Sequence, residues 1–174
     1  MYFSPEQISL ADQAFVRAEA LASGYFRLGP GALKAHRYDV RTKAYLKEHE
    51  VQGQAFAHLC KYEYGKETGD VGAGDRHFYR ICLQDDRILD AVKRAHSFIR
   101  LSPLLLYIAT HELVHVIRFD EGVIPFDAPR EVKDEEEETV HQITRRMLQP
   151  AANPELGLVL DCFSDRYRIG DLDH

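Results

Sequence analysis

One segment of the chain, residues 102–119, constrains the fold most, because it is strongly apolar and yet carries ionisable side chains in its middle. Ser102-Pro103 is typical of a helix start, with serine as the N-cap and proline at the first helical position. Apolar residues flank the central motif His111-Glu112-Leu113-Val114-His115 on both sides. Burying two histidines and a glutamate without partners is costly. The segment therefore predicts a buried helix whose polar side chains share a ligand.

The spacing of these polar residues predicts a divalent metal site, most simply zinc. Positions four apart on a helix share a face, so His111 and His115 can present two imidazole nitrogens to one ion. Glu112 is rotated by about a third of a turn, which leaves it near the ion and able to act as a general base. The alternative interpretation is a pair of surface histidines, or of hydrogen-bonded core histidines.

A single-metal site that keeps one position open for water needs a third protein ligand, and a second predicted helix, residues 130–148, offers several. The residues that helical periodicity places along its buried side are Glu137, Val140, His141 and Thr144. We take Glu137 as the third ligand and keep Glu138 and His141 as alternatives. The glutamates expected to be mainly solvated are Glu135 and Glu136.

The two segments together resemble the gluzincin group of HExxH metallopeptidases, over about residues 111–150. In that group the later helix carries Glu-x-x-x-(Asn/Asp/His), whose glutamate is the third zinc ligand and whose last residue steadies a ligand. More narrowly, Glu137–Thr144 followed by Met147-Leu148-Gln149-Pro150 resembles the ImmA/IrrE-type proteases, whose helix carries Glu-x-x-Ala-Asn-x-Phe-Ala and closes with Leu-Met-Pro. The residues of this chain that differ from that Ala, Asn and Phe are Val140, His141 and Ile143.

The resemblance implies a hydrolase, a zinc-dependent metalloprotease. With Zn²⁺ on His111, His115 and Glu137, the attacking water would be activated, and Glu112 would pass its proton to the leaving amine. The resemblance also implies a peptide or protein substrate lying along an edge strand before the metal helix, here residues 77–83 or the hairpin partner of that strand. The residues considered for stabilising the oxyanion are Tyr167 and His77.

The rest of the chain predicts an α+β, mainly helical, zincin-like domain spanning 1–174, with a small antiparallel sheet before the metal helix and the ligand-bearing helix. The expected elements are a helix from Ser4-Pro5 to Ser23-Gly24, a helix at about 39–50, a β-hairpin of 55–64 and 77–83 around a glycine-rich loop at 65–74, and a helix at about 87–99 capped by Asp85-Asp86. Beyond Glu155, we expect helix near 158–160 or a short strand near 167–169.

The composition of the chain argues against several classes of partner. The net charge of -6 and the pI near 5.8 argue against nucleic acid and anionic membranes. No signal peptide or membrane-spanning run is visible, and three dispersed cysteines without a CxxC pair disfavour a disulfide framework or a cysteine zinc site. We therefore expect a cytoplasmic protein in which Cys60 and Cys82 are small core residues.

Two other functions stay open. Glu112 with His115, and Glu138 with His141, form two Glu-x-x-His pairs, the spacing of di-iron carboxylate bundles. Such a site also needs glutamates from two further helices. Glu19, expected in the middle of a helix, could serve as one, but no lone glutamate on its own helix separates the two pairs, and the hairpin is foreign to that fold. The other alternative is a zincin-fold binding module without catalysis, because a chain this small leaves a shallow cleft.

Overall fold

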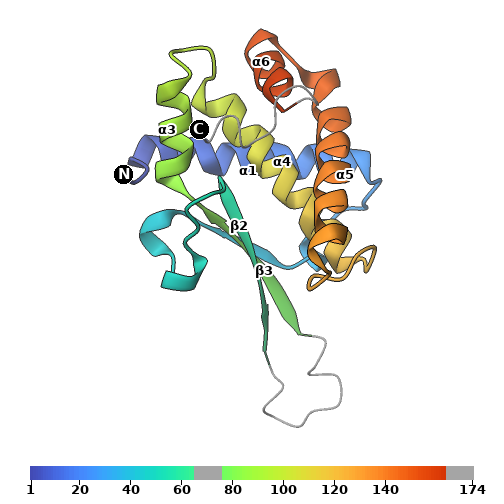
Figure 1. Cartoon of the computed structure of the whole chain (residues 1–174). Helices are drawn as coiled ribbons and strands as arrows, with labels where there is room; N and C mark the ends of the chain where they lie inside the picture. Colours follow the sequence, from blue (N-terminus) through green and yellow to red (C-terminus); the bar gives the residue numbers. More distant parts are fainter. Residues whose placement is uncertain (65–75, 164–174) are drawn as a thin grey trace.

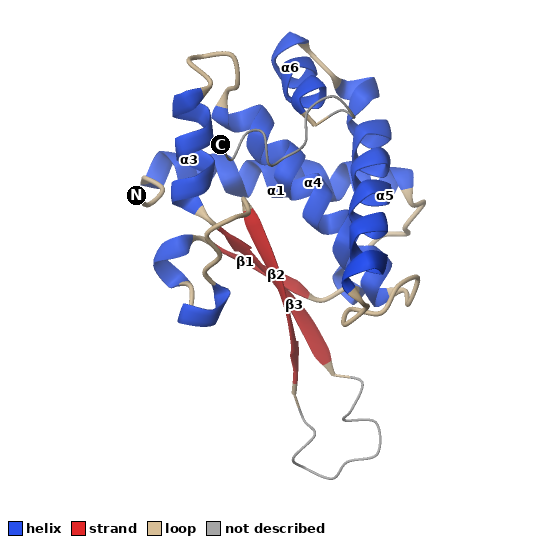
Figure 2. Cartoon of the chain, in the orientation of Figure 1, coloured by secondary structure: helices blue, strands red, loops and turns tan. Residues whose placement is uncertain are grey.

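The computed structural model describes residues 1–64 and 76–163, and this part of the protein is α+β and mainly helical (Figure 1). The helices are α1 (Pro5–Tyr25), α2 (Ala32–Ala35), α3 (Asp85–Arg94), α4 (Leu101–Asp120), α5 (Arg130–Leu148) and α6 (Pro154–Cys162). The strands are β1 (Tyr38–Arg41), β2 (Ala57–Glu63) and β3 (His77–Leu83), and the short 3-10 helices are η1 (Lys43–Tyr45), η2 (Glu48–Glu50) and η5 (Gln149–Ala151). The helices gather at one end of the sheet, and β2 and β3 extend away from them (Figure 2).

The sheet of the described residues has the order β1-β3-β2, with β2 antiparallel and β1 parallel to the central strand β3. The predicted hairpin is confirmed, whereas the purely antiparallel sheet is wrong because β1 runs parallel. Since β3 is central, residues 77–83 provide no free edge, and the hairpin partner β2 does. The predicted glycine-rich loop at 65–74 and strand near 167–169 lie outside the described residues.

The predicted helix at 39–50 is wrong, because this segment begins with β1 and continues into two short 3-10 turns. Long-range pairing explains the difference. Asp39 lies opposite Arg80 in the parallel register, and its carboxylate accepts a hydrogen bond from Nε of Arg80 at 3.0 Å. A partner about forty residues away thus outweighs the local helical pattern.

The predicted N-terminal helix is confirmed, with Ser4 and Gln7 forming a capping box. Two other cap assignments are wrong. Helix α3 has Gln84 as its N-cap, and Asp85 instead accepts hydrogen bonds from the backbone N–H groups of Phe3 and Lys43. Helix α4 begins at Leu101, so Ser102 lies inside its first turn and gives no cap.

Helix α4 lies at the centre of the helical part, packed between α1 and α5 (Figure 1). Every residue from Leu104 to Ile117 is buried, on all sides of the helix. A helix that is buried all round places even its polar residues inside the protein. The HExxH motif lies in the second half of this buried stretch, and its histidines contact Glu137 of α5.

The face of β3 opposite the helices carries a second buried polar group, which we call the Arg80 cluster. Its members are Asp39, Glu50, Tyr62 and Arg80, with His49 at its edge. The guanidinium of Arg80 binds the carboxylates of Asp39 and Glu50 and lies over the rings of Tyr62 and Phe78. A cation is thus enclosed between two anions and two aromatic faces.

Candidate metal centre

Two helices bring four of the predicted residues together, and we call this group the His–Glu centre: His111 and His115 from α4, Glu137 and His141 from α5. The carboxylate of Glu137 spans the two α4 histidines, with Oε1 2.9 Å from Nε2 of His111 and Oε2 2.9 Å from Nε2 of His115. Nε2 of His141 lies 3.5 Å from Oε1 of Glu137. Three imidazole nitrogens therefore surround one carboxylate.

The buried stripe of α5 decides which glutamate enters the centre. Val140 and Thr144 face α4, fully buried, and carry Glu137 and His141 on the adjoining turn. Glu138 points outward and is exposed, so it does not join the centre. The position of each glutamate around the helix therefore decides whether it faces α4 or solvent.

The prediction that Glu136 is solvated is wrong, whereas Glu135 is exposed as expected. Glu136 is 7% exposed, and its Oε2 accepts a hydrogen bond from Nη2 of Arg118 at 3.0 Å. Arg118 lies one turn beyond His115 on α4. The ion pair therefore fastens α5 to α4 next to the centre.

The donor set fits a metal ion. One ligand atom each from His111, Glu137 and His141 lies within 4.8 Å of the other two, a group that could hold a metal. The buried atoms Nε2 of His111 and Nδ1 of His115 have no well-formed hydrogen bond, although the first lies 2.9 Å from Glu137. Buried nitrogens without hydrogen bonds are rare unless something else binds their lone pairs. Imidazole and carboxylate suit zinc among several divalent metals.

The carboxylate of Glu137 and the histidines around it shift one another's pKa values. Burial would lower the pKa of His111, but the negative charge of Glu137 and the hydrogen bond to Glu112 raise it to about 10. Burial likewise opposes ionisation of Glu137, and His111 and His115 hold its pKa well below the usual range. Burial and the positive charge of His111 lower the pKa of His141 to about 3. Without a metal, a proton on His111 supplies the positive charge.

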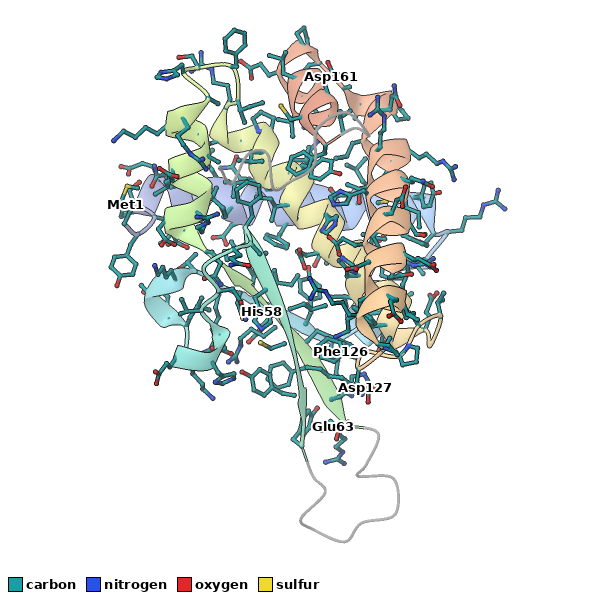
Figure 3. The ribbon with its side chains drawn as sticks, in the orientation of Figure 1. Met1, His58, Glu63, Phe126, Asp127 and Asp161 are labelled. Carbon is teal, nitrogen blue, oxygen red and sulfur yellow. The ribbon has the colours of Figure 1, made fainter. Side chains whose placement is uncertain are left out.

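Glu112, the predicted general base, is buried beside the centre, with its side chain 10% exposed. Its Oε1 lies 3.2 Å from Nδ1 of His111, the ring nitrogen that faces away from Glu137. The negative charge of Glu112 also acts on His58, which lies on the edge strand β2 (Figure 3). It raises the pKa of His58, but burial has the larger effect and lowers that pKa overall. The helix that carries Glu112, α4, is in contact with the edge strand β2.

Two aromatic residues of the site were not predicted. Tyr107, on α4, is 1% exposed, and its hydroxyl lies 2.7 Å from Nδ1 of His141. Phe163, just after α6, stacks on Tyr107 with 4.0 Å between ring centroids. The spacing of Tyr107 four residues before His111 is a sequence signal that could have placed it on the same helix face. Phe163 comes from a distant element and gives no such signal.

The other residues considered from the sequence lie elsewhere. The ring of His77 contacts Asp120 at the far end of α4, and the same carboxylate binds His36. Tyr167 lies outside the described residues, so neither is placed at the centre as an oxyanion group. The carboxylate of Glu19 accepts a hydrogen bond from the hydroxyl of Tyr38 and does not reach the centre. The cysteines confirmed as buried are Cys60 and Cys82.

Comparison with known proteins adds no assignment: no family model, curated protein or solved structure matches this chain. None of the helices in residues 1–64 and 76–163 combines the length and apolar character needed to cross a bilayer. The class of site is therefore defined by its own residues, as a buried His/Glu/His group on two helices that could hold a metal. The identity of that metal and its chemistry are matters for proposal.

Proposed function

We propose that this protein is a zincin-type metallopeptidase that uses one zinc ion to hydrolyse a peptide bond. The observation that carries the proposal is the placement of the Glu137 carboxylate, 2.9 Å from Nε2 of both His111 and His115. An HExxH helix followed by a helix that supplies a glutamate is the ligand pattern of the gluzincins, which this chain resembles at these positions. Three protein ligands leave the fourth position open for chemistry.

Each residue then has a distinct role. His111, His115 and Glu137 hold the metal, which when bound lowers the pKa of water and polarises a carbonyl. Glu112 accepts the proton of the attacking water and delivers it to the leaving amine. Glu138 has no part in the site.

The substrate we propose is an extended peptide or protein segment. Strand β2 is an edge of the sheet and is in contact with α4, the helix that carries the HExxH motif. A peptide could add to this edge by backbone hydrogen bonds, which would lay a peptide bond beside the His–Glu centre. We propose no nucleic-acid or membrane partner.

The two rival functions have less support. A di-iron site would need Glu138 and a carboxylate such as Glu19, but Glu138 is exposed and Glu19 binds Tyr38. A binding module without catalysis would not need a buried carboxylate at Glu112. No separate observation favours either one.

The test compares metal content and hydrolysis in the wild-type protein and in Glu112→Gln, with Glu138→Gln as the exposed control. We expect one zinc per chain in all three by elemental analysis, and cleavage of a peptide library by all except Glu112→Gln. If Glu112 only orients His111 through Nδ1, its loss should instead weaken zinc binding by about 10- to 100-fold. Two irons per chain would refute the zinc site, and undiminished cleavage by Glu112→Gln would refute the base.

A further inference from the structure

The role of His141 follows from the partner of its other ring nitrogen. Nδ1 of His141 lies 2.7 Å from the hydroxyl of Tyr107, a good distance for a hydrogen bond. The ring of Phe163 stacks nearly parallel to the rings of Tyr107 and His141, so it covers the hydrogen bond between them. The contact is thus short and shielded, and it joins α4 to α5.

The direction of this hydrogen bond can be deduced by counting protons. Among the described residues, the hydroxyl of Tyr107 has no hydrogen-bond partner except Nδ1 of His141. If Nδ1 carried a proton and donated it to Tyr107, the phenolic proton would be buried without an acceptor, which is costly. The tyrosine must therefore donate to Nδ1. That nitrogen then carries no proton, and the single ring proton lies on Nε2.

The protonated Nε2 of His141 faces the His–Glu centre but has no well-formed acceptor there. Its nearest acceptor, Oε1 of Glu137, is 3.5 Å away. The imidazole is the most exposed of the three at the centre, with 20% of its side chain accessible against 7% for His111. An N–H donor is therefore held beside the metal ligands, on the most exposed of the three imidazoles.

We propose that His141 is a catalytic hydrogen-bond donor to the substrate and not a metal ligand, and that Tyr107 is the residue that positions it. This inference rests on the proposed peptidase function. As the attacking water adds to the scissile carbonyl, negative charge develops on the carbonyl oxygen, and Nε2–H of His141 donates to that oxygen. A preorganised donor of this kind stabilises the transition state more than the bound substrate. Glu137 is then left as the third ligand.

The first test is the position of the ring proton, which requires no activity. Long-range ¹H–¹⁵N spectra of protein labelled with ¹⁵N-histidine distinguish the two tautomers, and His141→Gln identifies the signals by their loss. We expect the Nε2–H form of His141 in both the metal-free and the zinc-loaded protein. A proton on Nδ1 in the zinc-loaded protein would overturn the proposal, because Nε2 would then be a ligand.

The second test separates zinc affinity from turnover. In His141→Ala we expect zinc affinity within about threefold of wild type and turnover lowered by about 100-fold, the usual effect of removing one oxyanion donor. His141→Gln should recover part of the turnover, because its amide N–H can replace Nε2–H. A tenfold or greater loss of zinc affinity in His141→Ala, or wild-type turnover, would overturn the proposal.

Tyr107→Phe tests the positioning role, with Tyr45→Phe, an exposed tyrosine, as the control. We expect Tyr107→Phe to keep its zinc, to show a new population with the His141 proton on Nδ1, and to lose about tenfold in turnover. A ring proton still confined to Nε2 would overturn the role of Tyr107. If the wild-type protein cleaves no peptide but carries the proton on Nε2, the peptidase function fails while His141 remains a donor facing the metal.

Discussion

The His–Glu centre and the Arg80 cluster are alike in composition and opposite in how their polar atoms are satisfied. Each contains a carboxylate and at least one histidine, and at each a trio of side chains has its ligand atoms close enough together to hold a metal: His111, Glu137 and His141 at the centre, and His49, Glu50 and the neighbouring Cys60 at the Arg80 cluster. In the Arg80 cluster, Oε1 of Glu50 accepts from the backbone N–H of Lys47 at 2.8 Å, and Oε2 accepts from Arg80 and Tyr62. In the His–Glu centre, by contrast, buried nitrogens lack well-formed hydrogen bonds.

The difference indicates what each group requires. The Arg80 cluster contains its own cation, a guanidinium that cannot be deprotonated, so it is complete without a metal. The nearby His49 donates to the hydroxyl of Tyr62 at 2.8 Å, because that hydroxyl gives its own proton to Glu50. The His–Glu centre contains no guanidinium, and its positive charge can come from a proton on His111 or from a metal that the His111, Glu137 and His141 group could hold.

The sharpest contrast between the two groups is expected in zinc affinity. Glu137→Ala should weaken zinc binding by about 1000-fold, since each ligand of a zinc site contributes roughly 4 kcal/mol. Glu50→Gln should leave the affinity unchanged in the folded protein. Competition with a chelating dye measures both. A large loss in Glu50→Gln would show that the Arg80 cluster also binds metal and would break the comparison.

For the free energy of unfolding we expect the opposite: the substitution in the Arg80 cluster should have a large effect. Glu50→Gln should lower the free energy of unfolding by about 3 kcal/mol, because it removes one partner of a buried ion pair and leaves Arg80 short of an anion. The control is Glu48→Gln, an exposed neighbour on η2, for which we expect less than about 0.5 kcal/mol. Urea unfolding of the zinc-free proteins gives both values, and equal stability of the two variants would contradict an essential ion pair.

The pH dependence of unfolding tests the role of the Glu50 carboxylate in the wild-type protein, without a substitution at that position. Burial would raise the pKa of Glu50, but hydrogen bonds from Lys47, Tyr62 and Arg80 lower it from 4.5 to about 2. A lowered folded-state pKa stabilises the protein above the unfolded value, and this stability is lost as pH falls from about 4.5 toward 2. Wild type should therefore lose its advantage over Glu50→Gln across that window. A constant difference down to pH 2 would refute the assignment.

The smallest effect on stability is expected at the ion pair between Glu136 of α5 and Arg118 of α4. Glu136→Gln should cost about 1 kcal/mol, because a neutral amide accepts a weaker hydrogen bond from Arg118 than a carboxylate does. Glu135→Gln changes the same residue type one position away in solvent, and we expect no measurable effect on stability. Thermal unfolding of the two variants compares them directly. If the Glu135 variant were the less stable, the helical phase that also places Glu137 would be in doubt.

Local spacing made the core of the site predictable from the sequence. His111 and His115 share a helix face because of their separation alone, and the periodicity of α5 placed Glu137 and His141 together. Glu136 was misplaced because its partner, Arg118, belongs to another helix. Glu138 is exposed, whereas Glu137 lies against the α4 histidines, and this distinction within the run of four glutamates follows from the phase of α5.

Features that depend on distant partners were harder to predict. The segment at 39–50 has a helical pattern, and only its pairing with β3 makes part of it a strand. The contact between Tyr107 and His141 likewise depends on how two helices pack. Such contacts arise from tertiary structure, which the periodicity of a single segment does not contain.

The complete burial of α4 between Leu104 and Ile117 has a consequence for the kinetics of metal exchange. Backbone amides in such a core segment open to solvent only with global unfolding, so His111 and His115 are ordered before any ion arrives. Glu137 is different, since 46% of its side chain is accessible. The lifetime of a bound zinc ion should therefore depend on how often this one carboxylate swings away, and not on how often the protein unfolds.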